Sequence, residues 1–239
     1  MDDVTVVEPP GPGSVMAIAA HPDDIESWCA GTLARAVDAG ATVRLLLVTS
    51  GDKGSSDPAA TSDEVAAMRE AEAQRAAHLL GIFEVVFLRY PDGEVDETRG
   101  LRRDLVEWIR RWRPRAVFTH DPEYSLPPYL CHRDHRIVGR ATLDAIYPLA
   151  RDRLTFPEHV AAGLAPHAVT EAWLFASSAA RSFVDISTSI DRKIEVRLAH
   201  RSQTSDEDAL RLGWRERASI IGAAVHLPMA EAFTVLRID

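Results

Sequence analysis

The chain has 239 residues, of which 46% are hydrophobic and 26% charged, and this length and composition are typical of one medium-sized globular domain. Collagen-like, low-complexity and disordered classes are excluded. The formal net charge of −9 disfavours phosphate backbones and anionic lipids, so we expect neither nucleic acid nor a membrane as a partner. Two cysteines form no disulfide framework, and the first residues lack a secretory signal pattern, so we expect a cytoplasmic location.

The prolines and glycines of residues 1–13 predict an irregular lead-in. We expect a single domain over 14–239, and its regular elements begin there. Short apolar runs predict buried parallel strands over 15–20 and 41–49. Between them, helical spacing of apolar residues predicts a helix over 26–38 that stops at Gly40. These three elements form a strand, helix, strand unit.

The same alternation continues to the end of the chain. It predicts helices over 63–80, 97–112, 134–146, 189–199 and 206–224, and strands over 85–88, 116–119, 171–175 and 183–186. This order predicts an α/β fold with a Rossmann-like, doubly wound, mostly parallel sheet and helices on both faces. Segments 121–131 and 147–166 fit no regular element, and we expect them to be irregular connections that form substrate walls.

A polar cluster stands where the first expected strand ends, with the sequence His21-Pro22-Asp23-Asp24. The carboxyl ends of parallel strands form the ligand crevice of an open sheet, so we expect these side chains to face a site. Pro22 turns the chain sharply after the imidazole, which lets one carboxylate bind a metal while the other faces the substrate. The alternative is that Asp23 and Asp24 only cap the following helix.

A second cluster, His132-Arg133-Asp134-His135, stands at the start of an expected helix. Residues three apart share a helix face, so both imidazoles can converge on one point, although such a pair alone also fits a solvated helix start. Together with His21 and Asp24, this cluster can supply a two-histidine, one-carboxylate set with an open position, as in catalytic zinc sites. The same set can hold Fe(II) in oxygenases, which usually have β-rich scaffolds.

The two motifs together resemble those of the zinc-dependent N-acetylglucosaminyl deacetylases, the PIG-L or LmbE-like family. The resemblance extends to segments 49–54, 69–72, 91–93, 191–193, 200–203 and 230–233. It implies a hydrolase with Zn2+ as cofactor that removes the N-acetyl group from an N-acetylglucosamine-type small glycoconjugate. A catalytically silent sugar-binding relative is the alternative. Many relatives carry proline where this chain has Arg133, a departure that removes no ligand but bears on access and on substrate charge.

Residue by residue, the resemblance implies that the metal ligands are His21, Asp24 and His135. It further implies that Asp23 is the general base toward the metal-bound water. His132 would then donate a hydrogen bond to the developing oxyanion, with Asp134 orienting its imidazole. A helix-capping pair is the alternative for His132 and Asp134.

Two substrate contacts are also implied by the resemblance, with Arg69 and Asp92 meeting sugar hydroxyls. The alternatives are an exposed ion-pair face for Arg69 and a simple turn at Asp92. The sequence names neither the group attached to the sugar nor the oligomeric state, so a homo-oligomer stays open.

Overall fold

The computed structural model describes residues 4–123 and 131–239. Its strands are β1 (Thr5–Val6), β2 (Gly13–Ala19), β3 (Ala41–Thr49), β4 (Val85–Tyr90), β5 (Ala116–His120), β6 (Glu171–Phe175), β7 (Ser182–Asp185) and β8 (Ala230–Arg237). They form one sheet in the order β1-β7-β8-β6-β5-β2-β3-β4. Strands β4, β3, β2, β5 and β6 pair in parallel, and β8 runs antiparallel to both β6 and β7. The sheet is therefore mixed and mostly parallel, as expected.

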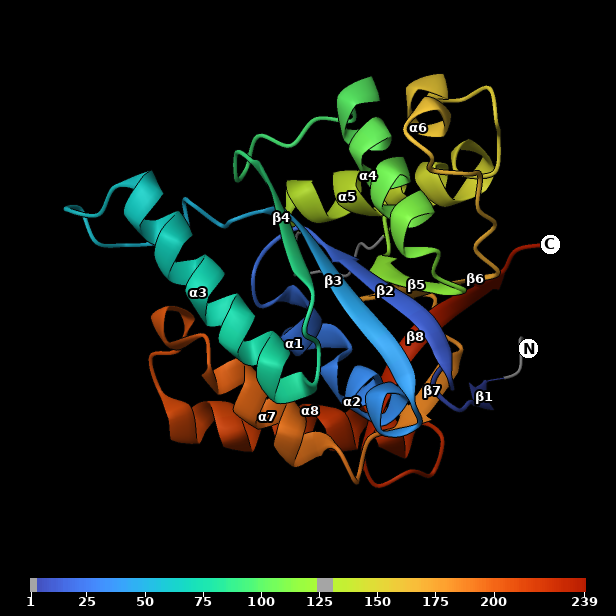
Figure 1. Ribbon diagram of the computed structural model, residues 1–239. Helices are drawn as coiled ribbons and strands as arrows, with labels where there is room; N and C mark the ends of the chain where they lie inside the picture. The colour runs from blue at the N-terminus through green and yellow to red at the C-terminus, as the bar shows by residue number, and fades with distance from the viewer. Residues whose placement is uncertain (1–3, 124–130) are drawn as a thin grey trace.

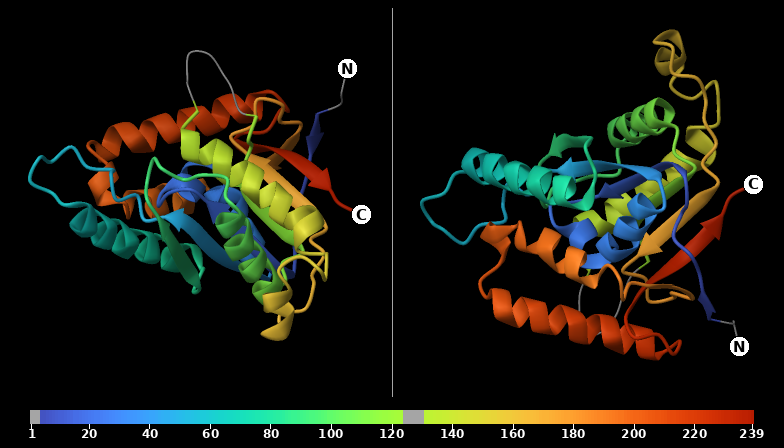
Figure 2. Two further views of the ribbon diagram at one scale, coloured as in Figure 1. Left: turned by 90° about the horizontal axis from the view of Figure 1, so that it is seen from above. Right: turned by 60° about the horizontal axis from the view of Figure 1, so that its bottom comes forward.

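Helices cover both faces of this sheet (Figures 1 and 2). On one face lie α1 (Asp24–Trp28), α2 (Ala30–Asp38), α3 (Ser62–Leu80), α7 (Ile190–Leu198) and α8 (Glu207–Ala223). The other face carries α4 (Arg99–Trp112), α5 (Arg133–Asp144) and the short α6 (Pro157–Ala161), as Figure 1 shows. A π-helical turn, Ala145–Leu149, extends α5, and a 3-10 turn, Arg201–Gln203, precedes α8. Within the described ranges, each helix is too short or too polar to span a bilayer.

The core is divided between the two faces by the alternation of side chains along the strands. In β2, Val15, Ala17 and Ala19 pack into one apolar cluster, whereas Met16 and Ile18 pack into the other. Successive side chains of a strand point to opposite faces, so a strand covered by helices on both sides is apolar at every position. This is why a continuous apolar run predicts this strand.

Local sequence signals fix the ends of the longest helix. Thr61 accepts a hydrogen bond from the backbone N–H of Glu64, whose side chain bonds back to the Thr61 backbone, a capping box at the start of α3. Gly81, at φ 87°, ends the helix in the left-handed region that glycine adopts without a steric cost. The helix thus holds a fixed register along the sheet, which positions Arg69.

Four expectations about elements need correction. The lead-in over 1–13 includes β1, which pairs with β7, and β2 already begins at Gly13. The helix expected over 26–38 is two helices, because Cys29 breaks it with a φ of −140°. Segment 147–166 contains α6, and β8 was not expected at all. Most of segment 121–131 lies outside the described residues.

Candidate active site

The candidate site lies at the carboxyl edge of the sheet, where the neighbouring strands β2 and β5 end. His21 and Asp24 follow β2, and His120 is the last residue of β5. His132 and His135 come from the first turn of α5. Because parallel strands end at the same edge, side chains more than a hundred positions apart in the sequence meet here.

Three of the expected ligands converge on one point. His135 Nε2 lies 3.1 Å from both His21 Nδ1 and Asp24 Oδ1, and Asp24 Oδ2 lies 3.5 Å from His21 Nδ1. The ligand atoms around a tetrahedral zinc ion lie about 3.3 Å apart, given bonds of about 2.0 to 2.1 Å. The spacing and the chemistry of His21, Asp24 and His135 therefore fit a divalent metal ion.

The charge of Asp24 is matched by the imidazoles around it. Burial alone would raise the pKa of Asp24, but the His135 and His120 rings hold it well below its usual range. Its Oδ2 also accepts a hydrogen bond from the backbone N–H of His21, at 2.7 Å. Asp24 is thus an anion at neutral pH, as a metal ligand must be.

Two carboxylates stand behind the His21 ring. Its Nε2 lies 3.1 Å from Asp92 Oδ1 and 3.4 Å from Asp134 Oδ2, and Asp134 also accepts a hydrogen bond from Gly93 N–H. Burial opposes the charge of His21, but its hydrogen bonds to Asp134, Asp24 and Asp92 raise its pKa to about 12. A carboxylate on one ring nitrogen of a histidine fixes the ring and its tautomer, so Asp92 and Asp134 fix the orientation of His21.

The carboxylate of Asp134 was expected to orient His132, but in the structure it contacts other residues. His132 Nδ1 accepts a hydrogen bond from the backbone N–H of Asp134, at 3.2 Å, so the imidazole caps α5. The described contacts of the Asp134 carboxylate are with His21, Gly93 and Arg133. The capping interpretation therefore holds for the His132 side chain, which is exposed at the rim of the site, 4.7 Å from the His21 ring.

Asp23 lies in a strained turn beside the ligands. Its φ of 92° is in the left-handed region, and its side chain makes no capping hydrogen bond to α1, so helix capping does not explain this carboxylate. Instead it lies 3.2 Å from Arg69 Nη2 and 3.5 Å from Arg197 Nη2. Burial and the Asp24 charge raise the pKa of Asp23 to about 6 against the lowering effect of both arginines. This places it in the range that suits a general base.

Arg69 clamps the loop that carries Asp23. The side chain is only 4% exposed, and it donates to Pro22 O at 2.7 Å and to Gly51 O at 3.0 Å as well as to Asp23. A Cβ at Gly51 would lie 2.2 Å from the guanidinium, so the glycine leaves the space that Arg69 fills. The exposed ion-pair interpretation of Arg69 is therefore wrong, and sugar contact by Arg69 stays a prediction.

The sequence analysis missed two residues of the site. His120 is buried, its Nε2 lies 3.2 Å from Asp24 Oδ2, and its ring stacks on His135 at 4.1 Å. Burial and the His135 charge lower its pKa to about 4, so His120 is neutral. Its position at the end of an expected strand could have revealed it, whereas Arg197 lies within an ordinary helical pattern that gave no such signal.

Two histidines and a carboxylate that could hold a metal ion lie next to a second carboxylate of raised pKa, an arrangement typical of metal-dependent hydrolases. Comparison with known proteins gives the family. The model of the family PIG-L, GlcNAc-PI de-N-acetylase, matches residues 16–146. The diacetylchitobiose deacetylase of Thermococcus kodakarensis is 32% identical over 193 residues, which cover 81% of this chain and 71% of that protein. The chain therefore belongs to the PIG-L family of de-N-acetylases.

Solved structures agree with this assignment. The N,N'-diacetylchitobiose deacetylase from Pyrococcus horikoshii superposes with a TM-score of 0.87 at 28% identity, over 94% of this chain and 84% of that one. GalB, the 4-carboxy-2-hydroxymuconate hydratase of a Pseudomonas, has a TM-score of 0.78 at 19% identity, over 95% of this chain and 97% of its own. The second likeness shows the fold alone, because one fold carries several chemistries.

Proposed function

We propose that this protein is a zinc-dependent hydrolase that removes the N-acetyl group from an N-acetylglucosamine-type small glycoconjugate. One observation carries the proposal: the side chains of His21, Asp24 and His135 approach one another pairwise within 3.5 Å, beside the carboxylate of Asp23. The activities of the similar proteins, diacetylchitobiose deacetylase among them, support this substrate class. The domain that does this chemistry is proposed to span residues 14–239.

The metal would be held by His21, Asp24 and His135. A bound Zn2+ ion supplies Lewis acidity, which polarises the acetamide carbonyl and lowers the pKa of a water molecule toward ~7. The donor set of two imidazoles and one carboxylate is the set that zinc takes in catalytic sites. Asp92, Asp134 and His120 keep the ligands in place from behind.

In this proposal Asp23 accepts a proton from the attacking water and returns it to the leaving amine. Arg69 and Arg197 keep the carboxylate ionised and aimed, because each contacts one of its oxygens. The exposed His132 would donate a hydrogen bond to the oxygen on which negative charge develops. Asp92 and Arg69 would in addition contact sugar hydroxyls.

The two cysteines, Cys29 and Cys131, are free and buried, which supports a reducing compartment such as the cytoplasm as the place of action.

The test is the release of free primary amine from a panel of N-acetylglucosamine conjugates by the zinc-loaded protein. We expect release from at least one conjugate by the native protein and none by Asp23→Ala. If the native protein released no amine from any conjugate at full zinc occupancy, the result would favour a sugar-binding relative without catalytic activity over the deacetylase.

A further inference from the structure

A cavity opens at the same edge of the sheet as the metal-ligand cluster. It has a volume of about 230 Å³ and lies between α1, α7 and α8, the end of β6 and the start of β8. Its apolar walls are Trp28, Ala176, Ile186, Trp214, Ala218 and Ile221. We call it the α8 pocket. It is smaller than the pockets that take drug-sized ligands, and its size suits a short chain or a single ring.

The α8 pocket shares walls with the catalytic loop. Ser27, on its lining, donates to the backbone carbonyl of Asp23 at 2.9 Å. Trp214, on the opposite wall, lies 5.9 Å from the guanidinium of Arg197, which contacts Asp23. At the end of β6, Ala176 directly follows Phe175, whose ring packs on His120 at 4.6 Å. The pocket thus adjoins the site from three separate elements.

Strand order places the α8 pocket on one flank of the metal-ligand cluster. The cluster follows β2 and β5, whereas the pocket lies at the ends of β6, β8 and β7, further along the sheet. On the other side of the cluster, Asp92 follows β4 and lies 3.1 Å from His21 Nε2. Neighbouring strands are about 4.8 Å apart, so roughly 10 Å separates the cluster from the middle of the pocket.

The polar side chains that line the α8 pocket are already bonded within the protein. Lys193 Nζ donates to Glu231 and to Ser27 O, and Glu231 also accepts from the backbone N–H groups of Gly31 and Thr32. Ser177 bonds to Thr234, and the Arg217 guanidinium lies over the Trp28 ring at 4.1 Å. These groups are committed to protein partners, so the occupant that fits best is neutral and apolar.

An amide held at the metal has two unlike halves. The amine half is a polyhydroxy sugar. The acyl half is apolar, as are the walls of the α8 pocket beside the cluster. We propose that the α8 pocket binds the acyl chain of the substrate, and that the protein hydrolyses N-acyl sugars with straight chains of roughly six to eight carbons as well as the acetyl form. This inference rests on the proposed function.

The reaction with a longer chain balances as ordinary amide hydrolysis. The oxygen of water forms a bond to the carbonyl carbon, the C–N bond breaks, and the nitrogen takes the proton that Asp23 removed from the water. The second proton of the water also passes to the nitrogen, so the products are an amino sugar in its ammonium form and a carboxylate whose chain occupies the pocket. No further reactant is needed.

The experiment measures kcat/KM of the zinc-loaded protein on N-acetyl-, N-butyryl-, N-hexanoyl- and N-octanoylglucosamine. Each methylene that enters an apolar pocket is worth about fourfold in binding, so we expect kcat/KM to rise from acetyl to hexanoyl. Ile221→Trp fills the pocket, and we expect it to lower the hexanoyl value at least about tenfold with little change for acetyl. Ile220→Trp is the matched control, since Ile220 is 67% exposed on the same helix.

The acetyl substrate shows in each variant whether the active site is intact. An Ile221 variant that fails to fold is inactive on both the acetyl and the hexanoyl substrate. Ala218→Leu, a smaller change on the same wall, then replaces it in the experiment. The inference is overturned if the native protein cleaves acetyl but loses activity with each added methylene, or if pocket filling lowers all chain lengths equally. Absence of activity on every chain length would contradict the proposed function itself.

Discussion

Arg69 determines where the proposed general base, Asp23, stands. Its guanidinium bonds to the carbonyls on either side of the crevice, Pro22 O and Gly51 O, and to the Asp23 carboxylate. These contacts hold a loop whose backbone is strained at Asp23, with a φ of 92°. Strain of this kind persists only where the surroundings enforce it, so Arg69 is the residue that allows Asp23 to keep its place.

Arg69→Met removes this clamp while keeping an unbranched side chain. We expect the free energy of unfolding to fall by about 3 kcal/mol, because the change leaves the Asp23 carboxylate without its nearest cation. We also expect kcat to fall more than KM rises, since the base loses its position. Urea unfolding and steady-state kinetics measure both effects. Arg75→Met, an exposed position on the same helix, is the control, and equal behaviour of the two variants would refute the clamp.

Residues of the site were predictable from the sequence where the motif is contiguous. His21, Asp23 and Asp24 stand together at a strand end, and His135 stands at a helix start, so their types and spacing indicate a metal centre. Arg197 was not predictable, because its partner Asp23 is far away in the sequence and the chain alone does not show which helix face meets the loop. The same holds for the contact of Asp134 with His21 instead of His132.

At the level of elements, one buried ion pair joins the end of the chain to its beginning. Glu231 on β8 accepts hydrogen bonds from Gly31 and Thr32 in the first turn of α2 and from Lys193 on α7. A carboxylate at a helix N-terminus satisfies backbone N–H groups that the helix itself leaves free. Strand β8 and two helices are thus fixed to one another by a single side chain.

Glu231→Met is expected to destabilise the protein by about 3 to 5 kcal/mol, because it strands the buried Lys193 ammonium without its anion. Adding Lys193→Met should recover part of this loss, since the double variant replaces the pair with apolar groups. Thermal or urea unfolding of the two single variants and the double variant measures the coupling. Additive losses would mean that the two residues act independently.

The elements that were not predicted from the sequence have a weak or unmarked sequence pattern. The strands β2, β3 and β5 are covered on both faces, so their apolar runs predict them directly. Strand β8 buries a charged residue, Glu231, and ends with exposed positions, so its hydrophobic pattern is weak. The helix break at Cys29 has no glycine or proline to mark it, and only the packed structure shows it.

For the molecule as a whole, the proposed metal centre links metal binding to folding. The three proposed ligands come from two distant segments, so the folded chain should bind the metal far better than the unfolded chain. At zinc concentrations about 100-fold above Kd, the free energy of unfolding should rise by about 2.7 kcal/mol. We expect a chelator to lower Tm of the native protein, and His135→Ala to remove this dependence. An unchanged Tm on chelation would contradict a metal centre built from these residues.

Stability should also depend on pH through His159 of α6, which is buried. Burial, and then the charge of Arg110, lower the pKa of His159 below its usual 6.5. As pH falls below about 6.5, the unfolded chain takes up a proton that the folded chain resists, so the free energy of unfolding decreases. His159→Gln should show a smaller decrease between pH 7 and pH 5.

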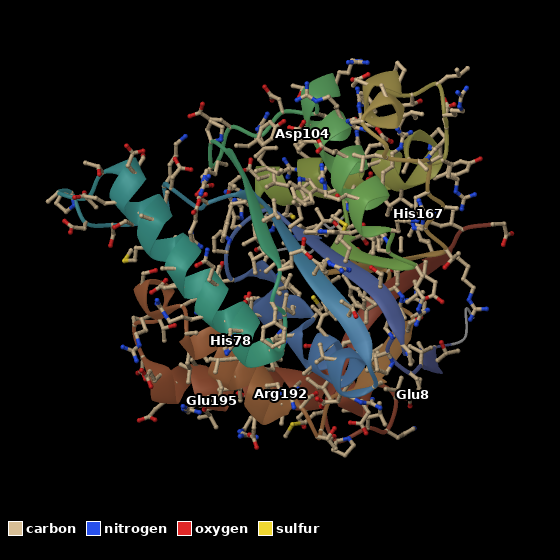
Figure 3. All side chains as sticks on the ribbon, viewed as in Figure 1. Glu8, His78, Asp104, His167, Arg192 and Glu195 are labelled. Carbon is tan, nitrogen blue, oxygen red and sulfur yellow. The ribbon has the colours of Figure 1, made fainter. Side chains whose placement is uncertain are left out.

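The control for this pH dependence is His78→Gln, because His78 is exposed on α3, near the lower edge of the molecule in Figure 3. We expect the His78 variant to keep the pH dependence of the native protein. Equal slopes in all three proteins would show that His159 titrates alike in the folded and unfolded states.

The central claim divides the work of two neighbouring carboxylates, with Asp24 holding the metal and Asp23 moving the proton. The most direct measurement determines zinc content and amine release together, for the native protein and for Asp23→Ala. The account predicts that Asp23→Ala keeps one zinc ion per chain and loses at least about a hundredfold in turnover. An Asp23→Ala protein that binds zinc and still releases amine at the native rate would contradict it.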